Sequence, residues 1–269
     1  MVDDVVMGST PRHVLGLSGG KDSAALAVFM RDRVPQMEYF LCDTGAELPE
    51  TYEYLLRLEA FLGKPIQRLN SGRPFEHWME VYRGTLPSPQ MRWCTRQMKL
   101  APLEAWLGDD AAVSYVGLRA DEHREGYVST RPNITSVFPF RQHGIDLRDV
   151  HRILEDAGLG LPAYYEWRSR SGCYFCFFQR KAEWVGLADR HPELFAQAVA
   201  LEQKAGFEAT RMQGRQYTWS QGESLEALLA RRDEIVAAAG RDRTPASNRL
   251  LDVLAGDDDD EQACLVCDL

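Results

Sequence analysis

The feature that most limits the fold is a regular alternation of apolar strands and amphipathic helices along the first half of the chain. Strand-like apolar runs occupy 13–17, 37–43, 64–69 and 112–119. Helical spacing marks 21–34, 49–63, 74–84 and 94–108 between and beside them. Strands that alternate with helices form a parallel sheet covered on both faces. We therefore expect an α/β fold with a Rossmann-like, doubly wound parallel sheet.

Beyond about residue 141 the strand patterns stop and only helical patterns follow, at 143–159, 178–190, 192–206 and 223–240. No repeat and no linker precedes the acidic end of the chain. We expect three parts: an α/β domain over 1–140, a mostly helical part over 141–255 packed directly on the sheet, and a flexible acidic tail over 256–269.

Composition limits the partners of the protein. The 269 residues are 45% hydrophobic and 26% charged, enough for one large core with at most a small appendage. The net charge is −9, but the tail GDDDDEQACLVCDL holds six acids and no base, so the rest carries only −3. A nearly neutral body argues against coating nucleic acid by bulk charge, although a local basic patch remains possible. Because no basic leader and no long apolar segment are visible, we expect a cytoplasmic protein with no membrane partner.

The stretch GLSGGKDS lies where the first strand ends and the first helix begins. In a doubly wound sheet this loop is at the carboxyl edge, where ligands bind. Gly19 and Gly20 let the backbone approach an anion, and Ser18, Ser23 and the amides at the helix N-terminus supply donors. Lys21 adds a mobile positive charge. The pattern predicts a pyrophosphate-binding loop, and it lacks the glycine spacing of a Walker motif.

This loop resembles the SGGxDS signature, or PP-loop, of the ATP pyrophosphatase and PAPS reductase-like superfamily, the adenine nucleotide alpha-hydrolase fold. Three more segments resemble that family: CDTGAELPETYEYL, RWCTRQMKLAPLEAWL and GLRADEHR. Members bind ATP, cleave it between the α and β phosphates and adenylate an acceptor. The resemblance therefore implies an enzyme that uses ATP, with Mg²⁺ bridging the phosphates.

The same resemblance implies roles for single residues of this chain. Asp43 and Thr44 would lie near the nucleotide, Lys99 would approach the phosphates, and Gly117 would help to complete the site. Placed cations stabilise the charge that develops on the α-phosphate and on the leaving pyrophosphate. The implied catalytic residues are Lys21, Asp22, Lys99 and Arg119. The implied nucleotide-binding residues are Ser18, Gly19, Gly20, Lys21, Asp22, Ser23, Asp43, Thr44, Gly117 and Arg119.

Six cysteines add a second kind of chemistry. Cys173 and Cys176 form a C-x-x-C turn that can grip a metal centre, and Cys94 lies in a segment that the family places near the nucleotide. We expect these three as ligands of a [4Fe–4S] cluster, with zinc, joined by His123 or His191, as the less favoured alternative. The fourth ligand is left open among Cys42, Cys264, Cys267 and none, and Cys42 also fits a small buried apolar residue.

The stretch YYEWRSRSGCYFCFFQRKAEW surrounds the C-x-x-C. Most of its aromatic residues fit core packing. Its four cations, Arg168, Arg170, Arg180 and Lys181, fit either contacts to a phosphate backbone or sulfate, or ordinary solvated charge.

Three functions remain open. The motif set is most similar to the DndC and SspD proteins of DNA phosphorothioation, which implies an ATP pyrophosphatase that activates a nucleic-acid acceptor, with DNA favoured, for sulfur insertion; a cysteine desulfurase and other modification proteins are the implied partners. The second is tRNA thiolation by the same chemistry. The third is a PAPS or APS reductase, for which Cys264 or Cys267 would be the nucleophile, although acidic neighbours raise a thiol's pKa. An adenylyltransferase subunit needs no C-x-x-C, and a nucleotide sensor without activity is the remaining alternative.

Overall fold

The computed structural model describes residues 10–123, 125, 129–213 and 217–242. At its centre is a five-stranded sheet in the order β3-β2-β1-β4-β5, with every neighbouring pair parallel. The strands are β1 (Arg12–Gly16), β2 (Glu38–Cys42), β3 (Ile66–Leu69), β4 (Ala112–Tyr115) and β5 (Ile134–Val137). The order reverses at β1, because the chain runs outward to β2 and β3 on one side and to β4 and β5 on the other. The predicted α/β fold with a doubly wound parallel sheet is confirmed.

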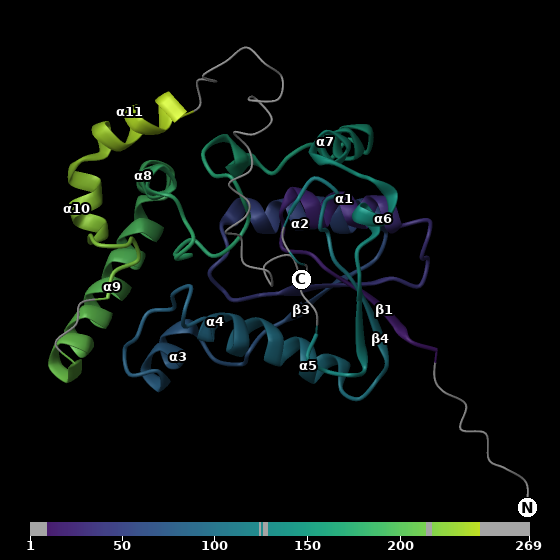
Figure 1. Ribbon diagram of the computed structural model, residues 1–269, viewed down its shortest axis with the longest axis horizontal. Helices are drawn as coiled ribbons and strands as arrows, with labels where there is room; N and C mark the ends of the chain where they lie inside the picture. Colours follow the sequence, from purple (N-terminus) through teal and green to yellow (C-terminus); the bar gives the residue numbers. More distant parts are fainter. Residues whose placement is uncertain (1–9, 124, 126–128, 214–216, 243–269) are drawn as a thin grey trace, which may run out of the picture.

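Helices cover both faces of the sheet (Figure 1). One face carries α1 (Lys21–Met30), α2 (Pro49–Leu62), α6 (Pro139–His143) and α7 (Leu147–Asp156), and the opposite face carries α3 (Phe75–Val81), α4 (Trp93–Thr95) and α5 (Ala101–Leu107). Helix α7 packs along α1 and places Val150 and Leu154 in the same apolar core. An Asp146 and Asp149 capping box starts α7, which fixes where this helix leaves the preceding loop.

The remaining helices form a separate group beside the sheet (Figure 1). They are α8 (Lys181–Arg190), α9 (Pro192–Gln213), α10 (Leu225–Ala230) and α11 (Arg232–Asp242), and a short 3₁₀ turn, η2 (Ala163–Glu166), leads into them. Helix α8 contacts α9, α10 and α11. The helical C-terminal part is confirmed, and α9 begins at Pro192, where the fixed φ of proline suits a first helical turn.

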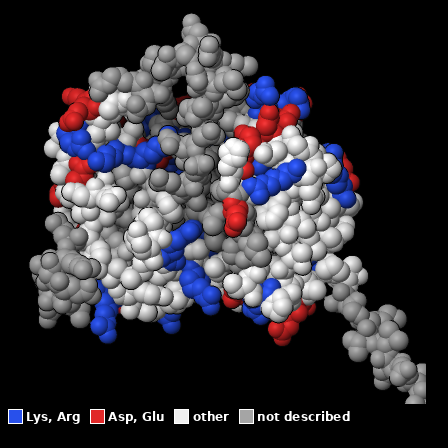
Figure 2. Space-filling view, in the orientation of Figure 1, with Lys and Arg blue, Asp and Glu red and all other residues white. Residues whose placement is uncertain are grey.

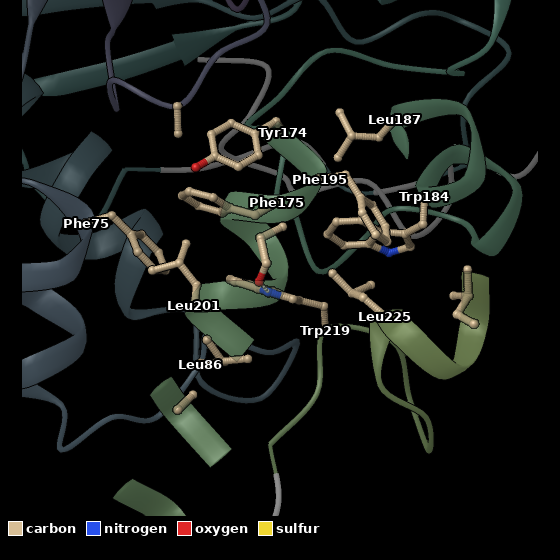
Figure 3. Packing of buried hydrophobic residues seen from close by; sticks show 14 of the residues in the cluster. Phe75, Leu86, Tyr174, Phe175, Trp184, Leu187, Phe195, Leu201, Trp219 and Leu225 are labelled. Atoms are coloured by element: carbon tan, nitrogen blue, oxygen red, sulfur yellow. Dashed lines mark hydrogen bonds between the residues drawn. The ribbon is translucent and has the colours of Figure 1, made fainter. Parts of the chain in front are cut away.

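An aromatic core joins this helical group to the helices under the sheet (Figure 3). The Phe75 ring lies 4.3 Å from that of Phe175, and Phe175 stacks on Trp219 at 5.3 Å. Trp184 is fully buried at the far end of the same cluster. Because Phe75 comes from α3 and the other three rings come from the helical part, the two parts share one continuous core. The helical part thus packs against the α3 side of the molecule through this cluster.

Three details differ from the sequence pattern. Strand β5, a short edge strand, has no strong apolar run and escaped the periodicity analysis. The expected helix over 94–108 contains a π-helical stretch, η1 (Arg96–Leu100), because Pro102 lacks an amide hydrogen and its ring would clash with the carbonyl four residues earlier. The expected helix over 223–240 breaks at Arg231, whose backbone leaves the helical region while its side chain binds Glu223.

Candidate functional site at the carboxyl edge of the sheet

The loop over 18–23 follows β1 and enters α1 at the switch point of the sheet, where the sequence placed it. Gly19 has a φ of +77°, a conformation that other residues adopt at a cost. A Cβ at this position would lie 2.5 Å from Cγ2 of Thr51 on α2. Glycine is therefore required here both by the backbone conformation and by the close approach of α2.

Hydroxyl groups line the inside of this loop. The Oγ atoms of Ser18 and Ser23 lie 3.2 Å apart, and Ser23 donates to the carbonyl of Gly20. The Ser171 hydroxyl, which belongs to the helical part, lies 3.1 Å from the Ser18 hydroxyl. Together with the backbone amides that begin α1, these groups can donate to the oxygens of a bound phosphate.

Two tyrosines that the sequence analysis did not select hold the loop from outside. Tyr164 is fully buried and donates from its hydroxyl to the carbonyl of Gly19 at 2.7 Å. The backbone amide of Lys21 donates to the Tyr165 hydroxyl at 3.1 Å, and the Lys21 ammonium lies 5.4 Å from the Tyr165 ring. No motif marks these residues, because their role depends on a contact between segments more than 140 residues apart.

Asp22 and Arg119 form a buried ion pair that links the loop to the segment after β4. Arg119 Nη1 lies 3.0 Å from Asp22 Oδ1, and its side chain is only 4% exposed. Burial alone would raise the pKa of Asp22, but Lys21 and Arg119 hold that pKa below its usual value. Gly117 lies against the start of α1, where an added Cβ would be 3.1 Å from the Asp22 carbonyl. The structure therefore brings four of the predicted residues together at one edge.

Arg119 has further acidic partners. Its Nε lies 3.1 Å from Asp121 Oδ1, and its Nη1 lies 3.4 Å from Glu122 Oε1. Glu122 is buried and its backbone carbonyl accepts from Arg141 at 3.0 Å. These contacts fix the guanidinium, so that it is a preorganised charge beside the loop rather than a mobile one. The neighbouring Arg124 of the same motif lies outside the described residues.

Asp43 and Thr44 follow β2 and have separate tasks. Asp43 shapes the turn, because its carboxylate accepts from the Gly45 amide at 2.9 Å and from the Tyr52 hydroxyl at 2.7 Å. The Thr44 hydroxyl donates to buried Glu47 at 2.8 Å and lies 3.1 Å from Cys173 Sγ. Thr44 therefore lies between the carboxyl edge of the sheet and the cysteines. Glu47, which lies inside the quoted motif, was not selected from the sequence.

Cys94, Cys173 and Cys176 line one pocket, as expected for a shared role. Cys94 comes from α4, and the other two come from the irregular loop before α8. Lys99 of the π-helical stretch and Thr44 line the same pocket. The remaining lining residues are Phe75, Pro87, Thr95, Met98, Phe175, Phe177 and Phe178. The pocket is thus mainly apolar and aromatic, with three thiols and one cation.

The loop over 167–180, which carries Cys173 and Cys176 and is called the thiol loop below, is held in place by buried groups. Burial, followed by the charge of Glu47, raises the pKa of Cys173 well above its usual value. Arg168 donates to the carbonyls of Gly172 and Cys173 at 3.0 and 2.9 Å and is only 2% exposed. The option that Arg168 contacts a phosphate backbone is therefore wrong, because this guanidinium is buried as a support for the loop.

The other candidate cysteines have different surroundings. Cys42 is buried at the end of β2, donates toward the Lys99 carbonyl at 3.5 Å and does not line the pocket. Burial raises its pKa to about 12, which fits a small core residue. Cys264, Cys267 and the predicted tail over 256–269 lie outside the described residues. Within the described ranges, no three His, Cys, Asp or Glu side chains gather closely enough to hold a metal ion.

Of the remaining cations beside the C-x-x-C, Lys181 forms an ion pair with Glu223 at 2.6 Å. Arg180 precedes α8, where its amide donates to Glu183 at 3.0 Å. Arg170 reaches a thiol, with Nη2 at 3.7 Å from Cys176 Sγ. On the face shown in Figure 2, basic and acidic side chains are interspersed rather than separated into one charged field.

None of the described helices has the length and apolarity needed to span a bilayer.

The sheet order, the loop at the switch point and the segment after β4 agree with one protein family. Its model, the phosphoadenosine phosphosulfate reductase domain, matches residues 12–166, more than half of the chain. The chain belongs to the phosphoadenosine phosphosulfate reductase domain family. The predicted PAPS reductase-like superfamily is thereby confirmed.

The chain is similar in sequence to two uncharacterized proteins of Methanocaldococcus jannaschii, MJ0973 and MJ0066. The first is 24% identical over 76% of this chain and 51% of its own length. The second is 26% identical over 68% of this chain and 39% of its own length. The chain thus spans about half or less of these two relatives. An uncharacterized 37.8 kDa protein of Escherichia phage 186 is 25% identical over 75% of this chain and 78% of its own length.

Among solved structures, the chain is similar to the phosphoadenylyl-sulfate reductase of Candida auris in its phosphate complex. The TM-score is 0.49 with 13% sequence identity, covering 61% of this chain and 82% of the other.

Proposed function

We propose that this PAPS reductase-family protein is an ATP pyrophosphatase that adenylates a nucleic-acid acceptor for sulfur insertion, with DNA phosphorothioation as the favoured setting. An acceptor oxygen attacks the α-phosphorus of ATP, and pyrophosphate leaves. A sulfur nucleophile then bonds to the activated acceptor atom, and AMP leaves with the oxygen. A cysteine desulfurase is the class of partner that would supply the sulfur, as a protein persulfide. A thiol reductant then attacks the inner persulfide sulfur, which forms a disulfide and releases hydrosulfide, the nucleophile of the second step.

One observation carries this proposal: the thiol loop contacts the carboxyl edge of the sheet at two points. Ser171 contacts the Ser18 hydroxyl at 3.1 Å, and two residues later Cys173 contacts the Thr44 hydroxyl at 3.1 Å. An acceptor activated at the nucleotide loop would therefore lie beside the thiols without a large movement. This contiguity fits a reaction in which activation and sulfur transfer occur in sequence on one acceptor.

The residues of the loop have distinct tasks in this reaction. Amides and hydroxyls over 18–23 bind the phosphates, and Lys21 and Arg119 neutralise charge that moves onto the leaving pyrophosphate. Asp22 keeps both cations in place, since it contacts each of them. Its carboxylate, whose pKa is lowered by these cations, would also be a suitable oxygen ligand for the expected Mg²⁺.

The proposal includes a [4Fe–4S] cluster held by Cys94, Cys173 and Cys176. The chemistry of the donors supports this, because three thiols line one pocket and thiolates are the usual ligands of such clusters. The three thiols do not gather closely enough to hold a single metal ion, so the loop would have to adjust around a cluster. When bound, a cluster with one open iron would hold the sulfur for transfer. Thr44 and Arg170 would orient the two thiols of the C-x-x-C, because each contacts one of them.

The test has two arms. Lys21→Ala should abolish pyrophosphate release from ATP while leaving the circular dichroism spectrum unchanged, and Arg152→Ala, on the exposed side of α7, should behave as wild type. Undiminished turnover in Lys21→Ala would remove the claim of ATP chemistry. Release of sulfite from PAPS with a thiol reductant, without ATP cleavage, would instead assign a reductase.

The second arm is the metal content of anaerobically purified protein. We expect about four irons and four sulfides per chain, with a broad absorption band. Serine variants of Cys94, Cys173 and Cys176 should each lose the iron, whereas the double variant Cys264→Ser with Cys267→Ser should keep it. One zinc without iron would contradict the cluster and leave adenylation alone.

A further inference from the structure

An aromatic ring flanked by two arginines lies at the cysteine pocket. Phe178 lines this pocket, and the guanidinium carbons of Arg92 and Arg170 lie 5.6 and 4.9 Å from its ring centroid. We call Arg92, Phe178 and Arg170 the rim platform. Arg92 precedes α4, and Phe178 and Arg170 belong to the thiol loop. The platform therefore joins α4 and the thiol loop, the same two segments that supply the three thiols.

The platform differs from the aromatic core behind it. Phe175 and Tyr174 are buried, whereas Phe178 and both arginines are half-buried and retain contact with solvent. The Phe177 ring lies 4.4 Å from that of Phe178 and extends the aromatic surface. The platform therefore combines an aromatic surface with two half-buried guanidinium groups.

The charged groups at the pocket are mainly basic, and the carboxylate of buried Glu47 lies behind the lining residues, 3.9 Å from Cys173 Sγ. Lys99 lines the pocket, Arg170 reaches Cys176, and no carboxylate is among the lining residues. A cationic rim with stackable planes and no lining acid suits an anion that also carries a flat ring system.

We propose that the rim platform binds a single nucleic-acid strand, with one unstacked base against Phe178 or its flanking guanidiniums and the adjoining phosphates on the arginines. Aromatic rings and guanidinium planes are the surfaces on which unpaired bases stack, and cations beside them hold the backbone. This inference rests on the proposed function, since it names the form in which the acceptor reaches the thiols: a single-stranded or locally opened segment rather than a closed duplex.

The test uses the full chain and a fluorescein-labelled 12-nucleotide DNA strand, with binding measured by fluorescence anisotropy. Phe178→Leu keeps an apolar side chain but removes the ring, and should weaken binding about tenfold. Arg92→Gln, which removes one platform charge, should weaken binding and lower the salt slope by about one. Phe61→Leu is the matched control, because Phe61 on α2 also lies under an arginine, Arg31.

Competitor arms identify the source of the strand. Unlabelled single-stranded DNA and single-stranded RNA of the same sequence should each displace the labelled strand, and Phe178→Leu should weaken the binding of both. The strand that binds more tightly indicates the natural acceptor. A closed duplex should compete at least tenfold less well. The proposal is overturned if Phe178→Leu binds as wild type, if Phe61→Leu loses as much as Phe178→Leu, or if the duplex competes equally.

Pyrophosphate release from ATP, measured on the same variants, separates the two proposals. Strand binding that depends on Phe178 in a protein that does not cleave ATP would refute the proposed function and leave the platform standing. ATP cleavage in a protein whose strand binding ignores Phe178 would refute the platform alone.

Discussion

The loop over 18–23 and the cysteine pocket lie next to each other but are held in place by different kinds of structure. The loop over 18–23 lies at the end of a central strand, and its geometry follows from the sheet, one glycine conformation and buried ion pairs. Among the described residues, those of the loop that carries Cys173 and Cys176 belong to no strand and no helix. Cys173 and Cys176 are placed by an irregular segment that rests on an aromatic core and on the buried guanidinium of Arg168.

This difference separates two sources of precision. Backbone hydrogen bonds in a parallel sheet fix the loop, so that its position depends little on any one side chain. The pocket depends on large side chains, since Phe175, one of its walls, stacks on Trp219 from a distant segment. We infer that the pocket is the more easily disturbed of the two, which gives three predictions in order of size.

The largest effect is expected from Trp219→Ala. This indole is 3% exposed, stacks on Phe175 and donates to the Ala198 carbonyl at 2.9 Å. Its loss should lower the free energy of unfolding by about 3–5 kcal/mol and loosen the pocket wall. Urea denaturation gives the stability, and iron content after anaerobic purification should fall well below that of wild type.

Phe140→Ala is the matching change in the sheet half. Phe140 on α6 is fully buried, and its ring lies 6.1 Å from that of Phe29 on α1. Its loss should lower the free energy of unfolding by about 3–5 kcal/mol, as for Trp219→Ala. Iron content of the folded fraction should stay near that of wild type, because this ring does not support the thiol loop. Equal loss of iron in both variants would remove the distinction between the two regions.

The same difference explains what the sequence could predict. Sheet, helices and loop follow from periodicity and one contiguous motif, and Gly117 and Arg119 lie in a motif after a recognisable strand. Cys94 and the C-x-x-C are 79 residues apart, and their common role came from a resemblance before the structure placed them in one pocket.

Other parts of the site left no readable signal. Tyr164, Tyr165 and Ser171 act on the loop through contacts across more than 140 residues, which no local pattern encodes. Arg168 has the same local sequence signature as a surface cation, and only the fold shows that it is buried. Burial of a single charge depends on three-dimensional packing, so composition cannot reveal it.

A smaller effect is expected from Gly117→Ala. The new methyl group would lie 3.1 Å from the carbonyl of Asp22, at a backbone segment that cannot turn aside as a side chain can. We expect a loss of about 1–3 kcal/mol of stability together with weaker ATP binding, because the start of α1 must shift. Calorimetric titration with a non-hydrolysable ATP analogue measures the second effect.

Gly186→Ala tests whether that weaker binding is local. Its Cβ would lie 2.7 Å from the ring of Trp167, so that packing is disturbed in the helical part, away from the loop. Stability should fall while affinity for the analogue stays unchanged. A similar loss of affinity in both variants would show that the loop is as sensitive to distant packing as the pocket.

The smallest effect concerns the surface of the helical group. Hydrogen bonds from Arg231 and Lys181 hold the pKa of Glu223 at about 2, below the ordinary 4.5. A carboxylate whose pKa falls on folding adds stability above the unfolded value, and that contribution is lost as the pH drops from about 4.5 to about 2. Thermal unfolding over this interval should show a slope that Glu223→Gln reduces.

High salt should reduce the same slope, because the pair lies near the surface, with 36% of the Arg231 side chain exposed. The loop provides the contrast. Asp22 also has a lowered pKa, but its partner Arg119 is almost fully buried, so that its acid-dependent contribution should resist salt. If Asp22→Asn and Glu223→Gln remove slopes that respond to salt alike, the loop's ion pair is as exposed in solution as the helical surface, and its preorganised charge cannot explain catalysis.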